Sequence, residues 1–182
     1  MINRFSGYDP KPTQDAREQL PVGGYISRIR KAWTENDKNG NLRLSISIEI
    51  IEGEYKGFFM KDYEAQRGGK YEAKYKGIYS FEVPTDSSQD VVKTRFNRAI
   101  GSIEASNEGF RFNFDETSLV GKVVGFLAQE DEYNGRTFTR IGILYDANKI
   151  REGKYRNMEK RKRQENANYS GMTQVDDGDM PF

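Results

Sequence analysis

The sequence contains no cysteine and no histidine among its 182 residues. Without cysteine there are no disulfides, thiolate zinc sites, iron–sulfur clusters or cysteine nucleophiles. Without histidine there are no Ser-His-Asp triads, imidazole general bases or metal sites that need a ring nitrogen. Most familiar enzyme classes are therefore excluded, and we expect a protein that is not an enzyme and that uses no cofactor or metal.

Long apolar runs are also missing. No run approaches the roughly 18 residues of a membrane span, and the N-terminus lacks the apolar core of a signal peptide. Hydrophobic residues make up only 35% of the chain, yet aromatic residues reach 13%, and disordered chains are poor in aromatics. We therefore expect one folded domain with polar tails and no contact with a membrane.

A net charge of +1 by itself argues against a nucleic-acid partner, because phosphate-binding proteins usually carry a basic surplus. The order of the charges along the chain changes this interpretation. Residues 1–150 are neutral, residues 151–164 carry a net charge of +5, and residues 165–182 carry a net charge of −4. Such asymmetry between segments is more informative than the total.

Residues 22–150 carry a β-rich pattern, between a polar N-terminal arm at 1–21 and the tail. The predicted strands cover residues 22–33, 42–50, 58–63, 123–128 and 137–145. The clearest is 42–50, in which leucine and isoleucine alternate with polar residues. Asp90 is a plausible N-cap for a helix from Val91 to about Ala105, where apolar residues recur at steps of four and three. Residues 65–90 show no regular pattern.

Five short strands with a helix between the third and the fourth are the layout of the OB-fold, a small Greek-key barrel that binds oligonucleotides and oligosaccharides. We therefore predict a mainly β protein: a five-stranded OB-fold barrel over 22–150 with one helix between strands 3 and 4. A basic linker (151–175) and an acidic tip (176–182) follow as a disordered C-terminal tail.

The acidic tip has a specific composition. Three carboxylates (Asp176, Asp177 and Asp179) precede Met180, Pro181 and Phe182. A terminal phenylalanine offers a ring and a carboxylate on one residue, so a partner needs only a small apolar pocket beside an arginine. The proline reduces the ordering cost of docking, and the aspartates speed encounter with a basic surface. The alternative is that these residues form an ordinary frayed terminus without a binding role.

This tip closely resembles the C-terminal tip of bacterial-type single-stranded DNA-binding proteins, with one departure at Gly178, where that family has another acidic residue. The body does not match the core sequence of the cellular family and is more similar to the divergent versions that bacteriophages encode. The resemblance implies a protein that binds and protects single-stranded DNA and recruits replication, recombination and repair proteins through its tip. It also implies a cytoplasmic location, in a bacterial host cell if the chain is phage-encoded. The sequence does not choose between a monomer and a homo-oligomer.

Single-strand binding needs cations along the phosphate track and flat side chains on which bases stack. The first two strands contribute the candidates Arg28, Arg30, Lys31, Trp33 and Arg43. Arg43 lies on the polar face of its strand, away from the predicted core. Trp33 could either pack in the core or stack on a base.

The third predicted strand and the segment after it contribute Phe59, Lys61, Tyr63, Lys74 and Tyr75. On the predicted strand, Phe59, Lys61 and Tyr63 share one face. Because Lys61 is charged, we expect that face to be the exposed one. If residues 70–75 are helical, their lysine–tyrosine pairs align as a flap over DNA; packing of the tyrosines against the barrel is the alternative.

The last hairpin contributes Tyr133, Arg136, Phe138 and Arg140, and the loop between strands 4 and 5 of an OB-fold commonly contacts ligand.

Three other functions stay open at this stage. A single-strand annealing or recombination-mediator protein would share the DNA-binding residues. A metal-dependent nuclease would use carboxylates such as Asp62 and Glu64, but two alternating acids in a strand are too common to support one. An oligosaccharide-binding barrel is compatible with the fold alone.

Overall fold

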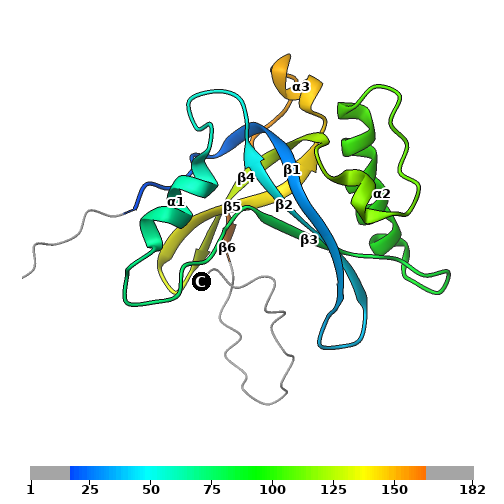
Figure 1. Ribbon diagram of the computed structural model, residues 1–182, viewed down its shortest axis with the longest axis horizontal. Helices are drawn as coiled ribbons and strands as arrows, with labels where there is room; N and C mark the ends of the chain where they lie inside the picture. Colours follow the sequence, from blue (N-terminus) through cyan, green and yellow to red (C-terminus); the bar gives the residue numbers. More distant parts are fainter. Residues whose placement is uncertain (1–16, 163–182) are drawn as a thin grey trace, which may run out of the picture.

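A strongly curved sheet of six strands dominates residues 17–162, the part of the chain that the computed structural model describes (Figure 1). The strands are β1 (Gly23–Asn36), β2 (Leu42–Ile50), β3 (Ile78–Glu82), β4 (Val123–Tyr133), β5 (Arg136–Tyr145) and β6 (Arg161–Lys162). The helices are α1 (Phe58–Gln66), α2 (Asp90–Ser106) and α3 (Ala147–Arg151), with a 3-10 turn, η1 (Glu116–Leu119). The mainly β class is confirmed.

Five strands are hydrogen-bonded in the order β3-β2-β1-β4-β5, and all of these pairs are antiparallel. β6 pairs in parallel with β4 and lies off this path. The sheet is open, because its edge strands β3 and β5 do not pair with each other within the described residues. The predicted closed, five-stranded barrel is therefore corrected to an open, six-stranded sheet.

The sheet curves around a main core that α1 and α2 cover from opposite ends (Figure 1). As the alternation in 42–50 predicts, Leu44, Ile46, Ile48 and Ile50 all face this core and are at most 2% exposed. Leu42, next to the turn between β1 and β2, is 43% exposed. That turn contains the pair Asn39-Gly40, a sequence typical of tight hairpin turns, with Gly40 at φ 81°, a backbone conformation that glycine adopts without steric cost.

The segment predicted as a third strand, 58–63, is instead the start of helix α1. The cause is a contact that is distant in sequence. The carboxylate of Glu49 accepts hydrogen bonds from the backbone amides of Phe59 (3.1 Å) and Met60 (2.7 Å), which are among the four amides that a helix N-terminus leaves unpaired. A negative charge at this end also favours the helix dipole. β2 therefore caps α1, and the period-2 pattern of 58–63 is coincidental.

Replacing Glu49 by alanine is expected to lower the free energy of unfolding by about 1–2 kcal/mol, because it leaves partly buried amides without an acceptor. The same carboxylate also lies 3.2 Å from the Tyr75 hydroxyl, so the variant loses that contact too. Urea denaturation measures the change. Glu54→Ala, an exposed glutamate in the loop before α1, is the control and should change stability by less than about 0.5 kcal/mol. Equal stability of the two variants would refute the capping role.

The true third strand, β3, lies within 65–90, where the sequence shows no regular pattern. Its five residues pair with β2 from Arg43↔Glu82 to Ser47↔Ile78. Just before it, a Cβ atom on Gly77 would come within 2.5 Å of the Ile48 carbonyl oxygen. The close backbone approach requires glycine, and a strand this short has too few alternating residues to stand out in the sequence.

The predicted helix is confirmed as α2, which buries Phe96, Ala99, Ile100 and Ile103. Asp90 is its first residue rather than its cap, and no side chain caps the N-terminus. The Phe96 ring lies 5.7 Å from the ring of Phe81, centroid to centroid. This contact attaches the N-terminal half of α2 to edge strand β3.

The final hairpin contains an irregularity that the alternation does not reveal. Ala128 pairs with Ile141, whereas its neighbour Leu127 pairs with Ile143. The extra residue on β5 is Gly142, so Ile141 joins the main core while Ile143 packs in a second cluster on the opposite face. Simple alternation along β5 would instead put both isoleucines on the same face of the strand.

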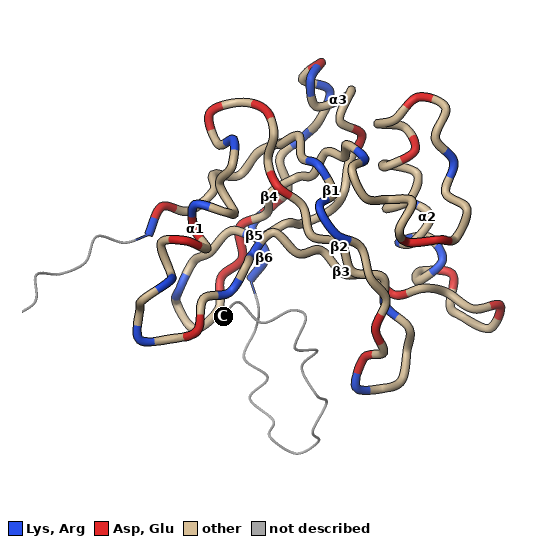
Figure 2. The backbone as a smooth tube through the Cα atoms, in the orientation of Figure 1, with Lys and Arg blue, Asp and Glu red and all other residues tan. Residues whose placement is uncertain are grey.

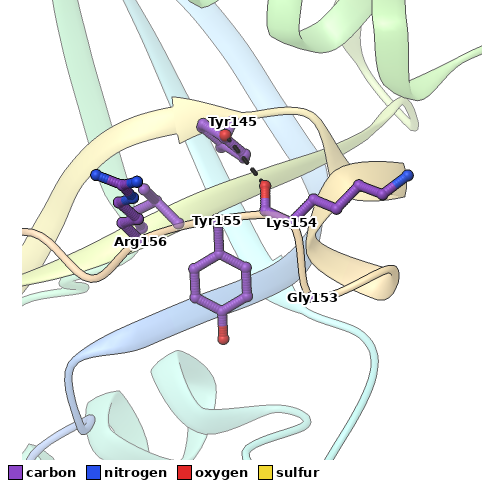
Figure 3. A pocket seen from close by; sticks show the side chains of 6 residues that line it. Tyr145, Gly153, Lys154, Tyr155 and Arg156 are labelled. Carbon is purple, nitrogen blue, oxygen red and sulfur yellow. Dashed lines mark hydrogen bonds between the residues drawn. The ribbon is translucent and has the colours of Figure 1, made fainter.

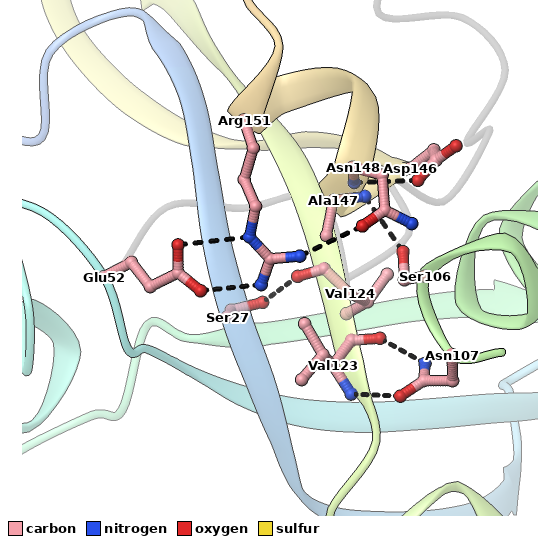
Figure 4. Close-up of polar contacts among 10 residues, drawn as sticks. All are labelled: Ser27, Glu52, Ser106, Asn107, Val123, Val124, Asp146, Ala147, Asn148 and Arg151. Atoms are coloured by element: carbon pink, nitrogen blue, oxygen red, sulfur yellow. Dashed lines mark hydrogen bonds and ion pairs between the residues drawn. The ribbon is translucent and has the colours of Figure 1, made fainter.

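The second cluster brings α3 against β1 and β4 on the face opposite the main core. Polar contacts attach α3 to its neighbours (Figure 4): Arg151 is bonded to Glu52 at 2.6 Å, and the Ala147 amide donates to the Ser106 hydroxyl at 2.9 Å. The chain after β5 is thereby attached to both the end of β2 and the end of α2.

The predicted arm at 1–21 is described only from residue 17 onwards. Leu20 belongs to the main core at 5% exposed, and the Gln19 side chain donates to the Thr137 carbonyl at 3.1 Å. The end of the arm therefore lies against the β4–β5 hairpin.

Candidate functional site

One side of the sheet, over β1, β2 and β3, is lined mainly by polar residues that belong to neither hydrophobic cluster. Ser45 and Ser47 are buried among them, and the others are half-exposed or exposed. The strand register arranges them in rows, each running from β1 through β2 to β3. The rows are Lys31–Ser47–Ile78, Trp33–Ser45–Ser80 and Glu35–Arg43–Glu82, with Arg28 opposite Glu49 beyond the first row. We call this surface the outer face.

A hydrogen-bond network connects the central rows of the outer face. The Ser45 hydroxyl donates to Glu35 Oε1 (3.1 Å) and is hydrogen-bonded to the Ser80 hydroxyl (2.9 Å). Arg43 donates from Nε to the Ser80 hydroxyl at 3.0 Å and from Nη2 to the Ser80 carbonyl at 3.1 Å. These hydrogen bonds hold the polar side chains in place across β1, β2 and β3. The two serines lie between the larger side chains of Glu35 and Arg43.

Trp33 lies on this outer face and is not part of the core. Its indole N–H donates to Glu35 Oε1 at 3.2 Å, and its ring is half-exposed in the row with Ser45 and Ser80. Because the neighbours in that row are serines, they add little bulk beside the indole. This geometry suits a flat ligand that stacks on the ring.

The cations of β1 gather at one end of the outer face, and Figure 2 shows blue Lys and Arg positions along β1. Arg28, Arg30 and Lys31 are all exposed. Arg30 occupies the irregularity between Ile29 and Lys31, where the pairing register with β2 shifts. Such a bulge re-aims side chains, and it places three cations within four residues on the surface.

The second group of predicted contacts lies around α1. Phe59 is only 5% exposed and packs 5.9 Å from the Phe126 ring, so it lies in the core and not on the exposed face predicted for it. Lys61 is exposed and Tyr63 is half-buried. They do not share a strand face with Phe59, because the segment is helical.

Lys74 and Tyr75 lie in a segment that is neither helix nor strand, so the helical flap considered for 70–75 does not form. Lys74 is exposed. The Tyr75 hydroxyl donates to the Ile48 carbonyl at 2.7 Å, and burial, followed by the charge of Glu49, raises the pKa of Tyr75 despite the nearby Arg30. Tyr75 therefore packs against the sheet, as the alternative interpretation held.

The third group occupies the β4–β5 hairpin. Tyr133 is 41% exposed, Arg136 is exposed and Phe138 is half-buried. Arg140 Nε lies 3.0 Å from Asp131 Oδ2, and the side chains are 28% and 0% exposed. The buried carboxylate fixes the position of this arginine at the surface.

The described part of the predicted linker, 151–162, packs along this hairpin. Lys160 Nζ lies 3.0 Å from Glu130 and 2.9 Å from Glu132 on β4, and this lysine lowers the pKa of Glu132. Acidic side chains of the sheet thus neutralise part of the basic segment. Not all of the net charge of +5 in 151–164 is therefore available to bind a ligand.

A shallow depression of about 540 Å³ lies where the second cluster meets the segment after α3 (Figure 3). Leu127, Tyr145 and residues 153–156 line it, and the Tyr145 hydroxyl donates to the Lys154 carbonyl at 3.3 Å. Its lining has no acid, so it contains no pair of catalytic carboxylates.

Residues 17–162 contain no group of three or more acidic side chains placed to hold a metal ion. Asp62 and Glu64 lie on helix α1 rather than on a strand, where residues two apart do not share a face. Asp62 is buried and paired with Lys76 at 3.3 Å. The same part of the chain has no helix with the length and apolar character of a membrane span. The acidic tip, 176–182, lies outside the described residues.

Sequence reasoning missed several residues of the outer face. Ser80 and Ile78 were hidden because β3 was placed twenty residues too early, and Ser45 and Ser47 were noted only as the polar side of β2.

Comparison with protein-family models and with curated protein sequences finds no match for this chain.

Proposed function

We propose that this protein binds single-stranded DNA on its outer face, without strong sequence preference. The observation that carries the proposal is the half-exposed Trp33 on a polar sheet surface, beside the exposed cations Arg28, Arg30 and Lys31. Stacking on an aromatic ring together with cations along a backbone track is the combination that sequence-tolerant single-strand binding requires.

The topology supports the same proposal. The strand order β3-β2-β1-β4-β5, with α2 connecting β3 to the turn before β4, has the connection order of an OB-fold, in which the face of strands 2 and 3 binds oligonucleotides. We therefore propose that the sheet is an open version of that fold. The outer face over β2 and β3 would then be the ligand side.

The C-terminal tip supplies the second part of the proposed function. The residues Asp176, Asp177, Asp179, Met180, Pro181 and Phe182 resemble the recruiting tip of bacterial-type single-stranded DNA-binding proteins. We propose that they recruit replication, recombination or repair proteins. The chain would then bind DNA through its sheet and partner proteins through its C-terminal tip.

The direct test is fluorescence polarisation with labelled oligo-dT and with a duplex of the same length. The protein is expected to bind oligo-dT at least tenfold more tightly, because paired bases cannot stack on Trp33. Affinity for oligo-dT should fall as salt rises, since bound cations release counterions from the strand. Equal affinity for the two DNAs would overturn the proposal. An annealing assay with complementary strands separates this function from a strand-pairing one.

A further inference from the structure

The loop that follows α1, residues 67–74, has no part in the hydrophobic core. None of its residues belongs to either hydrophobic cluster, and all of them except Ala73 are exposed. A single acidic residue accompanies three basic ones, Arg67, Lys70 and Lys74, and Figure 2 shows blue positions along this loop. Compact surface loops whose ends lie close together are frequently functional, so the way in which this loop is held is informative.

Two buried side chains of α1 hold the ends of the loop together. Gln66, which is 7% exposed, donates from Nε2 to the Lys74 carbonyl at 3.0 Å and accepts at Oε1 from the Lys74 amide at 2.9 Å. The same Nε2 donates to Asp62 Oδ2 at 2.8 Å, and Asp62 pairs with Lys76 at 3.3 Å. Because both backbone groups of Lys74 are bonded to one buried side chain, the exposed part of the loop starts and ends at a fixed base.

The loop presents an aromatic ring to solvent. Tyr71 is 79% exposed, and the Lys70 ammonium lies 5.6 Å from the centroid of its ring, within the range of a cation–π contact. A base can stack on an exposed ring, and a neighbouring ammonium can pair with a phosphate, which are the two contacts of sequence-tolerant single-strand binding. Adjacent residues of this loop therefore supply both kinds of contact.

Hydrogen bonds place the end of this loop at the edge of β2. The register between β2 and β3 runs only as far as Ser47↔Ile78, and Tyr75 occupies the edge of β2 beyond that pair, with its hydroxyl 3.2 Å from Glu49 Oε2. Tyr71 precedes Tyr75 by four residues, and four residues span at most about 14 Å. The exposed ring of Tyr71 is therefore carried close to this edge.

This edge adjoins the end of the outer face that carries the cations of β1. The β2 partners of Arg28 and Trp33 are Glu49 and Ser45, which are four positions apart on a strand and so share one face. The carboxylate that lies beside the Tyr75 hydroxyl thus belongs to the same side of the sheet as Trp33. A strand bound on the outer face reaches the loop when it continues past Arg28 and crosses β2.

We infer that the loop 67–74 is a second contact site for single-stranded DNA, in which a base stacks on Tyr71 while Arg67 and Lys70 bind the phosphates beside it. A guanidinium group donates paired hydrogen bonds to phosphate oxygens, and an ammonium acts on them as a point charge. This inference rests on the proposed function and extends its binding path from the outer face to the loop after α1. It adds a stacking ring to the one that Trp33 provides.

The first test replaces Tyr71 by alanine in the full chain and measures polarisation with labelled oligo-dT. The variant should bind about fivefold more weakly or worse, the loss typical of one base–aromatic stack. Tyr71→Phe keeps the ring and should stay within about twofold of wild type. Neither variant removes a charge, so the slope of log affinity against log salt should not change.

The matched control is Phe114→Ala, which removes a ring of equal exposure, 79%, from the loop between α2 and η1. It should leave oligo-dT affinity within about twofold of wild type. An abasic strand of equal length provides the second control, because Tyr71→Ala should bind it as tightly as the wild type does. Thermal unfolding should show that the variants are folded, since both replaced side chains are exposed.

A charge variant tests the phosphate contacts separately. Each phosphate contact on a single strand contributes about 0.7 to the salt slope, so Arg67→Ala/Lys70→Ala should lower that slope by about 1.4. The loss should be the same with the abasic strand, because phosphates remain in it. Arg111→Ala/Lys149→Ala removes equal charge from exposed positions in other parts of the chain and should leave the slope unchanged.

The outcomes distinguish this inference from the proposed function. A wild-type protein that binds no oligonucleotide overturns both. If the wild type binds and Tyr71→Ala loses no more affinity than Phe114→Ala, only the loop site is refuted. An equal loss of affinity for the abasic strand, or a phenylalanine variant as weak as the alanine variant, would also refute stacking on Tyr71. An unchanged salt slope in the charge variant would refute the phosphate contacts.

Discussion

Replacing Trp33 by alanine is expected to weaken oligo-dT binding by about 1–3 kcal/mol, roughly 5-fold to 150-fold, the loss typical of one base–aromatic stack. The indole is half-exposed at the β1 end of the row Trp33–Ser45–Ser80, and the serines of that row offer no alternative ring. Trp33→Phe keeps a flat ring and should recover most of the affinity. Wild-type fluorescence should be quenched when DNA binds, since Trp33 is the sole tryptophan.

The matched control for this prediction is Phe114→Ala. Phe114 is 79% exposed on the loop between α2 and η1, away from the outer face, so its loss should leave affinity within about twofold of wild type. If the two alanine variants bind equally well, stacking on Trp33 is not the basis of recognition. A loss that Trp33→Phe does not restore would instead indicate that the indole N–H bond to Glu35 is the important contact.

Removing residues 176–182 is expected to abolish recruitment of partner proteins while leaving oligo-dT affinity unchanged or tighter. The Phe182 ring and its carboxylate can together fill an apolar pocket beside an arginine, and the aspartates attract a basic partner but repel phosphates. Pull-down with purified replication and recombination proteins of the source organism measures the first effect, and polarisation measures the second.

A single substitution, Phe182→Ala, provides the finer comparison for the tip. It keeps every acidic residue and should still lose recruitment, whereas Asp176→Asn should weaken it only severalfold and mainly at low salt. Retention of partners by the truncated chain would show that recruitment uses another surface. Loss of oligo-dT affinity on truncation would show that the tip contributes to DNA binding.

The predictions that depended on local sequence patterns were the most accurate. The Leu and Ile alternation of 42–50 identified β2 and its buried face, because a half-buried strand repeats every two residues whatever it pairs with. The apolar stripe of 91–105 identified α2 for the same reason, with a different period. The Asn-Gly pairs at 39–40 and 134–135 are local signals of the two hairpin turns, since such turns need positive φ. Composition alone excluded thiol and imidazole chemistry.

The errors arose where a distant contact decided the local structure. Phe58–Tyr63 has the alternation of a strand, but Glu49 provides a cap for a helix there, and no local signal reports an acceptor ten residues away. β3 is short and was hidden within an irregular segment, so its partners on the outer face could not be identified. Ile143 left the main core because Gly142 adds a residue to β5, a change that reverses the face of every residue beyond it.

By itself, therefore, the sequence determined a β-rich protein without thiol or imidazole chemistry, a neutral body and an acidic end terminating in Phe182. These properties follow from residue types and short-range periodicity. Only the tertiary structure decided which side of β1 Trp33 occupies and that Phe59 lies in the core. Those arrangements depend on strand register and on packing between residues that are distant in the sequence, and no local pattern encodes them.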